Sequence, residues 1–116
     1  MYTKIKILTP VTDYKNENVK QTDERGIKKK NDKGEEIELT WRDVVFEALN
    51  GFTKDEQPTS ETRQQCYQLT NRIFSSDEID LTVVQMAFIL DRIDRVYMYS
   101  PMIYGRSKEF FELKEK

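Results

Sequence analysis

The chain contains no histidine and only one cysteine, Cys66, among its 116 residues. Histidine is the usual general base near neutral pH and the commonest metal ligand, so neither role can be filled in the usual way. A single cysteine excludes an internal disulfide and a zinc site of the cysteine–histidine type within one chain. The lack of a disulfide framework is typical of a reducing compartment, and we expect a cytoplasmic protein.

Glycine and proline are also scarce, with four and three residues. A phosphate-cradling loop needs closely spaced glycines, and none of the GxGxxG, Walker A, HExxH or GxSxG motifs occurs. No apolar run approaches the roughly 18 residues of a membrane span. The first residues, MYTKIKIL, lack the apolar region of a signal peptide. We therefore expect a protein that is not an enzyme and has no cofactor.

Acidic clusters are the remaining candidates for catalysis or metal binding. They lie at Glu35–Glu38 and at Asp77–Asp80. Such carboxylates could hold a cation or form a glycosidase-type pair, but acids in charge-rich loops are usually solvated or cap helices. Cys66 falls on an apolar helical stripe with no histidine to activate it, so we interpret it as a buried, inert thiol. No catalytic or metal-binding residue is assigned.

Charge is abundant but balanced. Charged residues make up 34% of the chain, with 19 basic against 21 acidic side chains and a net charge of −2. This balance argues against bulk electrostatic binding to nucleic acid or to anionic lipid, although a local basic patch would still be compatible with it.

Two short segments alternate polar and apolar residues in the manner of half-buried strands, Lys4–Ile7 and Glu36–Leu39. An antiparallel pair of the two would place two lysines opposite two glutamates, and each such pair stabilises a sheet by about 0.2–1 kcal/mol. The polar stretch 11–34 between them is predicted to be a mobile arm or a long, ragged hairpin connection. No internal repeat is evident.

Apolar stripes at helical spacing predict the helices. A first helix begins at the cap formed by Thr40 with Asp43 and presents a stripe from Trp41 to Leu49. A second begins at Thr59 or Ser60 and ends near Phe74. A fourth follows Pro101 and covers Met102–Leu113, with anchors at Ile103, Phe110 and Leu113.

The longest and most apolar helical pattern is the third, Leu81–Tyr99. Thr82 and Gln85 form a capping box at its start, and Glu78–Leu81 before it is a candidate for a short extended piece. Val83–Leu90 is apolar almost all round, so it should need cover on two sides. The second half carries a polar face, made of Asp91, Arg92, Asp94 and Arg95.

These elements predict an α+β fold: a small antiparallel β-ribbon packed on three to four helices, with a long central helix at about 82–99. The length suits a single domain, 1–116, with 11–34 as its polar arm.

Two surfaces could carry recognition. Tyrosine, methionine and arginine are enriched at interfaces, and a segment that follows the central helix is rich in all three. Its candidate residues are Arg95, Tyr97, Tyr99, Met102, Tyr104, Arg106 and Lys108. The alternative interpretation is that most of these rings close the core. A secondary candidate is Lys28, Lys29 and Lys30 in the arm, although acidic neighbours favour a solvated loop.

Five short motifs follow one another along the chain: a P-x-x-D turn at Pro10–Asp13, a strand that runs into a helix at Ile37–Ala48, the spacing of Tyr67, Leu69 and Ile73, the entry Leu81–Thr82, and Pro101 with Gly105 and Arg106. In this layout the chain resembles small uncharacterised proteins of tailed phages and prophages. The arm is longer than the turn that such proteins usually carry. The resemblance implies no particular activity, but it implies action in a host cytoplasm.

Three functional hypotheses follow. The first is a non-enzymatic phage accessory protein that binds a host protein or assembles with itself as a homo-oligomer. The second is sequestration of a small anionic ligand, such as a signalling nucleotide, by Tyr97, Tyr104, Arg106 and Lys108. The third is nucleic-acid binding through Lys28–Lys30, which would be steeply salt-dependent.

Overall fold

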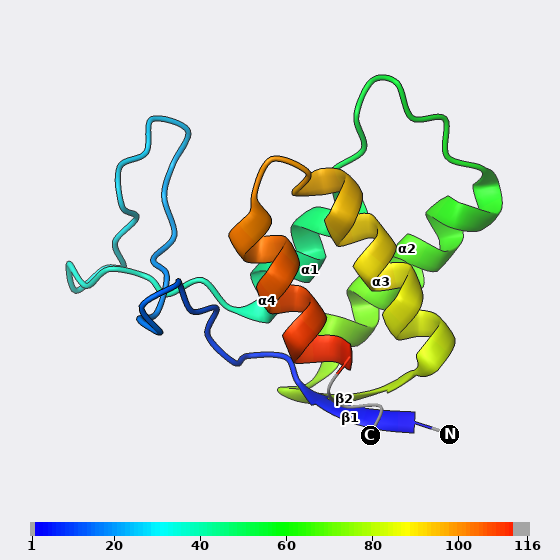
Figure 1. Ribbon diagram of the computed structural model, residues 1–116, viewed down its shortest axis with the longest axis horizontal. Helices are drawn as coiled ribbons and strands as arrows, with labels where there is room; N and C mark the ends of the chain where they lie inside the picture. Colours follow the sequence, from blue (N-terminus) through cyan, green and yellow to red (C-terminus); the bar gives the residue numbers. More distant parts are fainter. Residues whose placement is uncertain (1, 113–116) are drawn as a thin grey trace.

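Four helices packed side by side above a two-stranded ribbon form the body of the protein in the computed structural model, which describes residues 2–112 (Figure 1). The α+β class predicted from the sequence is confirmed. The elements are β1 (Tyr2–Lys6), α1 (Trp41–Asn50), α2 (Ser60–Ser75), β2 (Glu78–Thr82), α3 (Val83–Val96) and α4 (Pro101–Glu112).

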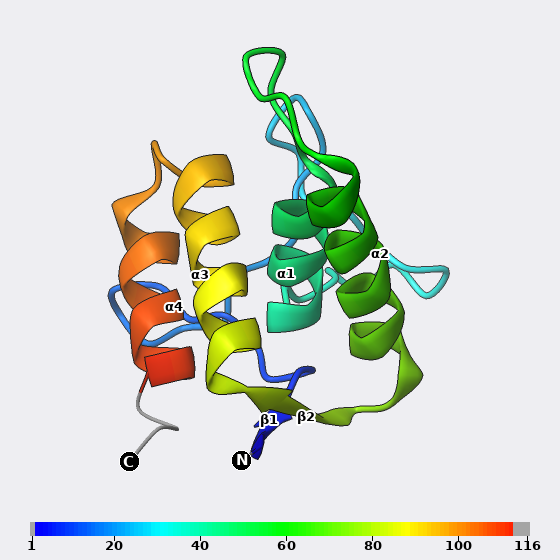
Figure 2. The same ribbon diagram turned by 90° about the vertical axis from the view of Figure 1, so that its right-hand side faces the viewer.

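The helices lie in the order α4, α3, α1 and α2, so the two central ones are covered on both sides (Figure 2). The apolar stripe predicted for the first helix, Trp41 to Leu49, is buried as expected. Trp41 stacks on Phe110 with 5.0 Å between ring centroids, and this contact joins α1 to α4. The capping boxes of Thr40 with Asp43 and of Thr82 with Gln85 are both present.

The ribbon pairs different segments from those predicted. β1 lies antiparallel to β2, with Tyr2 opposite Thr82 and Lys6 opposite Glu78. The expected pairing of Lys4–Ile7 with Glu36–Leu39 is therefore wrong. Asp80 and Glu78 meet the same requirement for opposite charge across the strands, and the alternating Ile79 and Leu81 of β2 are buried beneath the helices.

The central helix is shorter and less enclosed than predicted. α3 ends at Val96, short of Tyr99, and its 14 residues are fewer than the 16 of α2. Val83 and Val84 are 53% and 72% exposed, so the expected cover on two sides is absent from the first turn. The buried face, which carries Met86, Ile89, Arg92 and Ile93, is narrow, and the first turn keeps contact with solvent on its other sides.

Residues 11–39 form a branched structure, here called the arm, that contains a repeat not recognised in the sequence. Three five-residue turns span 13–17, 23–27 and 31–35. In each, the side-chain oxygen of the first residue accepts the N–H groups of the third and fifth residues, and the fourth residue has positive φ. This is the type I turn with a G1 bulge. The acceptors are Asp13, Asp23 and Asn31, and the positive-φ residues are Asn16, Gly26 and Gly34.

Backbone hydrogen bonds join the three turns at two triangular junctions (Figure 1). At the first junction, the N–H of Val11 donates to Leu39, that of Leu39 to Val19, and that of Val19 to Val11. A second triangle links Gln21, Ile37 and Lys29, the members of which are 8 to 16 residues apart in the chain. The segment 36–39 that was predicted to pair with β1 is thus engaged inside the arm.

Two polar contacts hold the arm against the body. The guanidinium of Arg106 on α4 donates to the carbonyl of Asp13 at 2.6 Å and to the side-chain oxygen of Asn16 at 3.2 Å. Nε2 of Gln21 donates to the carboxylate of Asp43 at 3.2 Å. The arm is therefore attached to α4 through its first turn. It is attached to α1 through Gln21 in its stem, the part of the arm between the two junctions (residues 19–21 and 37–39).

Candidate functional site

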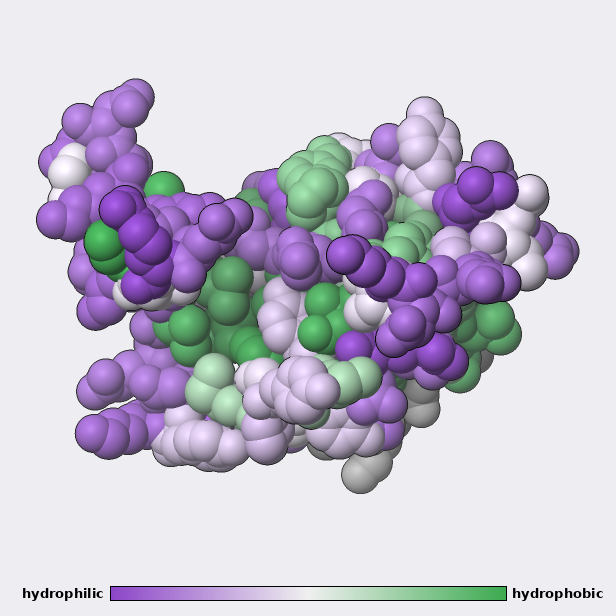
Figure 3. All heavy atoms as spheres, turned by 90° about the horizontal axis from the view of Figure 1, so that it is seen from above, coloured by the Kyte–Doolittle hydropathy of each residue, from purple (hydrophilic) through white to green (hydrophobic). Residues whose placement is uncertain are grey.

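A groove of about 700 Å³ lies between the arm and the helical body. We call it the arm groove. The stem of the arm forms one wall. The other wall is formed by α1, the end of α3, the turn that follows it and the start of α4. Seen from above, apolar residues form the floor of the hollow between the polar arm and the body (Figure 3). The apolar lining comes from both walls and includes Val19, Leu39, Phe46, Val96, Met102 and Ile103.

Tyr97 is the titratable aromatic residue of this groove. It is half-buried, and burial, followed by the negative charges of Glu47 and Asp43, raises its pKa to about 12. The phenol therefore stays protonated near neutral pH and can donate a hydrogen bond. The carboxylates of Glu47 and Asp43, which contribute to the shift after burial, make the potential negative at the α1 side of the groove.

The walls carry opposite charges. Lys29 of the arm and Glu47 of α1 both line the arm groove, and both also line a second hollow that continues toward the turn 23–27. Part of the hydrogen-bonding capacity of Asp43 is already used, because its carboxylate accepts hydrogen bonds from Thr40 and Gln21. Glu47 is exposed, and no ion pair holds it within the described part of the chain.

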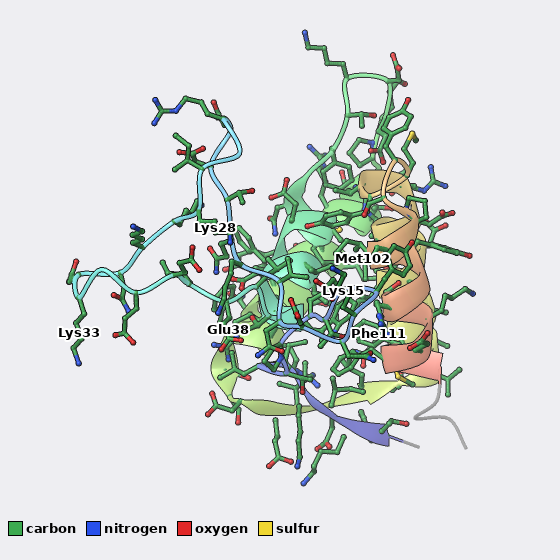
Figure 4. The ribbon with its side chains drawn as sticks, turned by 60° about the vertical axis from the view of Figure 1, so that its left-hand side comes forward. Lys15, Lys28, Lys33, Glu38, Met102 and Phe111 are labelled. Carbon is green, nitrogen blue, oxygen red and sulfur yellow. The ribbon has the colours of Figure 1, made fainter. Side chains whose placement is uncertain are left out.

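The structure brings part of the two predicted recognition surfaces together. Tyr97, Met102 and Lys29 all line the arm groove. Tyr99 is 93% exposed on the adjoining turn, next to the groove residue Ser100. Figure 4 shows Lys28 and Glu38 on the arm and Met102 on α4 beside it.

The other predicted residues are placed elsewhere. Arg106 attaches the arm to the body, as described above. On α4, the ammonium group of Lys108 lies 5.8 Å from the ring centroid of Tyr104. Arg95 pairs with Asp91 at 3.1 Å on α3 and lines a separate pocket beneath the loop 55–58.

The other two lysines of the secondary candidate are held differently. Lys28 pairs with Glu36 at 3.6 Å within the arm, whereas Lys30 is exposed.

Sequence reasoning missed Glu47 and Phe46 as groove residues, and it treated Asp43 only as a helix cap. One available signal was the i,i+4 spacing of Asp43 and Glu47, which places two acids on one face of α1. Phe46, 42% exposed, lies off the buried stripe of the same helix.

Arg92 was expected on a polar helix face but is buried, at 3% exposed. Its Nε donates to the carbonyl of Ala48 at 3.0 Å, its guanidinium pairs with Glu56 at 2.5 Å, and it lies 4.2 Å above the ring of Phe52. The hydrogen bond from Arg92 holds the pKa of Glu56 below its usual value. Arg92 thus donates hydrogen bonds to backbone carbonyls at the C-terminal end of α1, and its charge has a structural role.

Other sites for chemistry are few. Cys66 is buried as predicted, and this burial raises the pKa of its thiol. Within residues 2–112, no group of three acidic or cysteine side chains is placed to hold a metal ion. None of the helices described is long and apolar enough to cross a membrane. Comparisons with protein-family models, with curated proteins and with solved structures found no match, so the resemblance to phage proteins stays a prediction from sequence motifs.

Proposed function

We propose that the protein is a non-enzymatic binding protein that holds a segment of a partner protein in the arm groove. The observation that supports this most directly is the apolar floor shared by two walls of opposite charge. Such a floor suits an apolar side chain of a partner, and the charged walls suit its polar neighbours. If the resemblance to phage proteins holds, the partner would be a host protein.

The chemistry of the groove favours a segment that pairs an apolar residue with a basic one. Glu47 supplies an exposed carboxylate. The negative charges of Glu47 and Asp43 add to the effect of burial in raising the pKa of Tyr97. A guanidinium or ammonium group beside Glu47 would also lie near the ring of Tyr97, and cation–π contacts contribute about 0.5–2 kcal/mol.

The same geometry disfavours sequestration of a small anion. An anion against Tyr97 would face Glu47 and Asp43. Two of the cations that this alternative requires already have contacts, since Arg106 donates to the arm and Lys108 lies over Tyr104.

Nucleic-acid binding through the arm is disfavoured by charge. Residues 11–39 contain seven basic and eight acidic side chains, a net charge of −1. A phosphate backbone needs an excess of positive charge along the contact surface.

A peptide selection with charge-reversed variants tests the proposal. The full chain would be immobilised and exposed to a random peptide library, and the enriched sequences should combine an aromatic or aliphatic residue with arginine or lysine. These peptides should bind Glu47→Lys at least tenfold more weakly. The matched control is Asp94→Lys, which makes the same charge change on the exposed face of α3, and it should leave affinity unchanged.

An acidic consensus, or peptides that bind Glu47→Lys as tightly as the original protein, would contradict the proposal. A thermal shift with nucleotides such as ATP would revive the anionic-ligand alternative.

A further inference from the structure

The two edges of the β1–β2 ribbon differ in a way that points to a second binding site. The hydrogen bond from Ile7 N–H to Asp77 O, at 3.0 Å, continues the register of the ribbon. Since hydrogen-bonded pairs alternate along antiparallel strands, the backbone groups of Lys4 and Asp80 point away from the partner strand.

Side chains occupy part of the outward edge of β2, with one backbone group engaged on each outward-facing residue. The N–H of Glu78 donates to Oγ of Ser76 at 3.4 Å, the carbonyl of Asp80 accepts from Arg72 at 2.9 Å, and the N–H of Thr82 donates to Gln85 at 2.9 Å. An edge with these groups occupied is a poorer template for another strand.

The outward edge of β1 is open. Its last carbonyl, that of Lys6, accepts the N–H and the hydroxyl of Thr9. Within residues 2–112, the N–H groups of Lys4 and Lys6 donate no hydrogen bond and the carbonyl of Lys4 accepts none. β1 lies at the lower margin of the body, below the helices (Figure 2), and none of its residues lines the arm groove.

We propose that this edge of β1 accepts an extended segment of a partner protein as a third strand. Main-chain hydrogen bonds would supply affinity, and side chains at alternate positions would supply specificity. β1 has five residues, so the added strand would be about as long.

Charge decides what kind of segment fits. Lys4 and Lys6 lie on the exposed face of β1, where β2 already offers Asp80 and Glu78 as their partners. A third strand with acidic residues on this face would meet the lysines from the other side. On the opposite face its accessible neighbour would be the half-buried Thr3, beside the fully buried Ile5, and this position suits a β-branched apolar residue. The occupant is therefore a strand that alternates acidic and apolar residues.

A second copy of the chain fits less well. If two β1 edges paired, Lys4 would face Lys4 or Lys6 of the other copy, and like charges directly opposite destabilise a sheet. Lysine on an edge strand commonly prevents the same edge of two copies from pairing. Here the two lysines therefore favour a strand with acidic residues.

The probe is a capped peptide that alternates glutamate and valine, compared with its lysine–valine counterpart. The glutamate peptide should shift the backbone amide signals of Lys4 and Lys6 in NMR spectra and slow their hydrogen exchange. The lysine peptide should bind at least tenfold more weakly. No change at these amides with millimolar glutamate peptide would overturn the proposal.

A proline substitution separates the backbone contact from the side-chain contact. Lys4→Pro removes an outward N–H that the β1–β2 ladder does not use, and proline is tolerated at such edge positions. It should weaken the glutamate peptide at least tenfold, whereas the control Lys4→Ala should weaken it only a few-fold. Equal binding by Lys4→Pro, with the ribbon intact by nuclear Overhauser contacts between β1 and β2, would refute the strand model.

Neutral substitutions cover the case in which Lys4→Pro disturbs the ribbon. The double variant Lys4→Gln and Lys6→Gln keeps the outward N–H groups, places no like charges opposite Asp80 and Glu78, and should bind the glutamate–valine and lysine–valine peptides about equally. An unchanged preference would contradict the assigned chemistry. A wild-type dimer in sedimentation that Lys4→Pro dissociates would assign the edge to a second copy and also overturn the proposal.

Discussion

The helical body and the arm are stabilised by different means. Of the 18 buried hydrophobic residues within the described chain, only Val11 belongs to the arm. The arm instead satisfies its backbone with two hydrogen-bonded triangles and with side-chain acceptors in its three turns. Burial organises the body, and local turn chemistry organises the arm.

This difference has a consequence for the arm groove. Segments with few buried apolar contacts open at lower free energy than a packed core does. The wall formed by α1 and Tyr97 packs on the core along its length. The opposite wall contacts the core only through Val11, Val19 and Leu39 within the described residues, and otherwise depends on its turns and on two polar attachments to the body. We therefore expect the arm to adjust to a partner while α1 keeps its position.

The largest effect is expected within the body, from the buried charge on α3. Arg92→Ala should lower the free energy of unfolding by about 2–4 kcal/mol, because the half-buried Glu56 would lose its partner and the buried carbonyl of Ala48 would lose its donor. Urea denaturation measures this change as a lower transition midpoint.

Arg95→Ala is the matched control on the same helix. Arg95 pairs only with the exposed Asp91, and exposed pairs contribute about 0.2–1 kcal/mol. Similar losses of unfolding free energy in the two variants would mean that Arg92 does not bind the end of α1 in solution. A buried charge would then matter no more for stability than an exposed one.

A smaller effect, confined to the arm, is expected at Gly26. Its φ of +80° is unfavourable for a residue with a Cβ, although a Cβ would meet no atom within 4 Å. Gly26→Ala should therefore strain the turn 23–27 by about 1–2 kcal/mol. Hydrogen exchange of the Ile27 amide should rise several-fold, while the urea midpoint of the body stays unchanged.

Gly26→Asn is the conservative comparison, because the first turn already uses Asn16 at the equivalent position with φ of 64°. It should raise exchange less than alanine does. A drop in the stability of the whole protein by either variant would show that arm and body unfold together.

The body could be predicted from its sequence to a large extent. Apolar stripes at helical spacing and the caps at Thr40 and Thr82 located helices that the structure confirms. The pairing of strands could not be resolved in the same way. Segments 36–39 and 78–82 both alternate acidic and apolar residues, so either could pair with β1. Which of them does so depends on where the helices place β2.

The arm escaped prediction for a local reason and a global one. Its repeat is degenerate, since Asn16 replaces glycine in the first turn and Asn31 replaces aspartate in the third, and the spacing changes from 10 to 8 residues. The triangular junctions are made by backbone groups, which leave no mark on side-chain patterns. Tyr97, Met102 and Lys29 were identified as recognition candidates, but their shared groove depends on where the arm lies.

The smallest effect is expected from acid, which should open the first turn of the arm when Asp13 is protonated. The N–H groups of Glu17 and Lys15 hold the pKa of Asp13 below its ordinary value. Since the unfolded turn binds a proton more readily, the stabilisation is present above the ordinary pKa of about 3.9 and is lost as pH falls through the lowered value. Asn31 accepts the same two hydrogen bonds in the third turn but does not titrate.

The amide NMR signals of Lys15 and Glu17 should therefore move toward random-coil positions below about pH 3.9, while those of Lys33 and Glu35 stay in place. Asp13→Asn should abolish the pH dependence of the first turn without opening it, because the amide oxygen preserves both acceptor contacts. Equal acid sensitivity of the first and third turns would show that the arm opens as one unit, and that its turns are less independent of one another than their separate side-chain acceptors suggest.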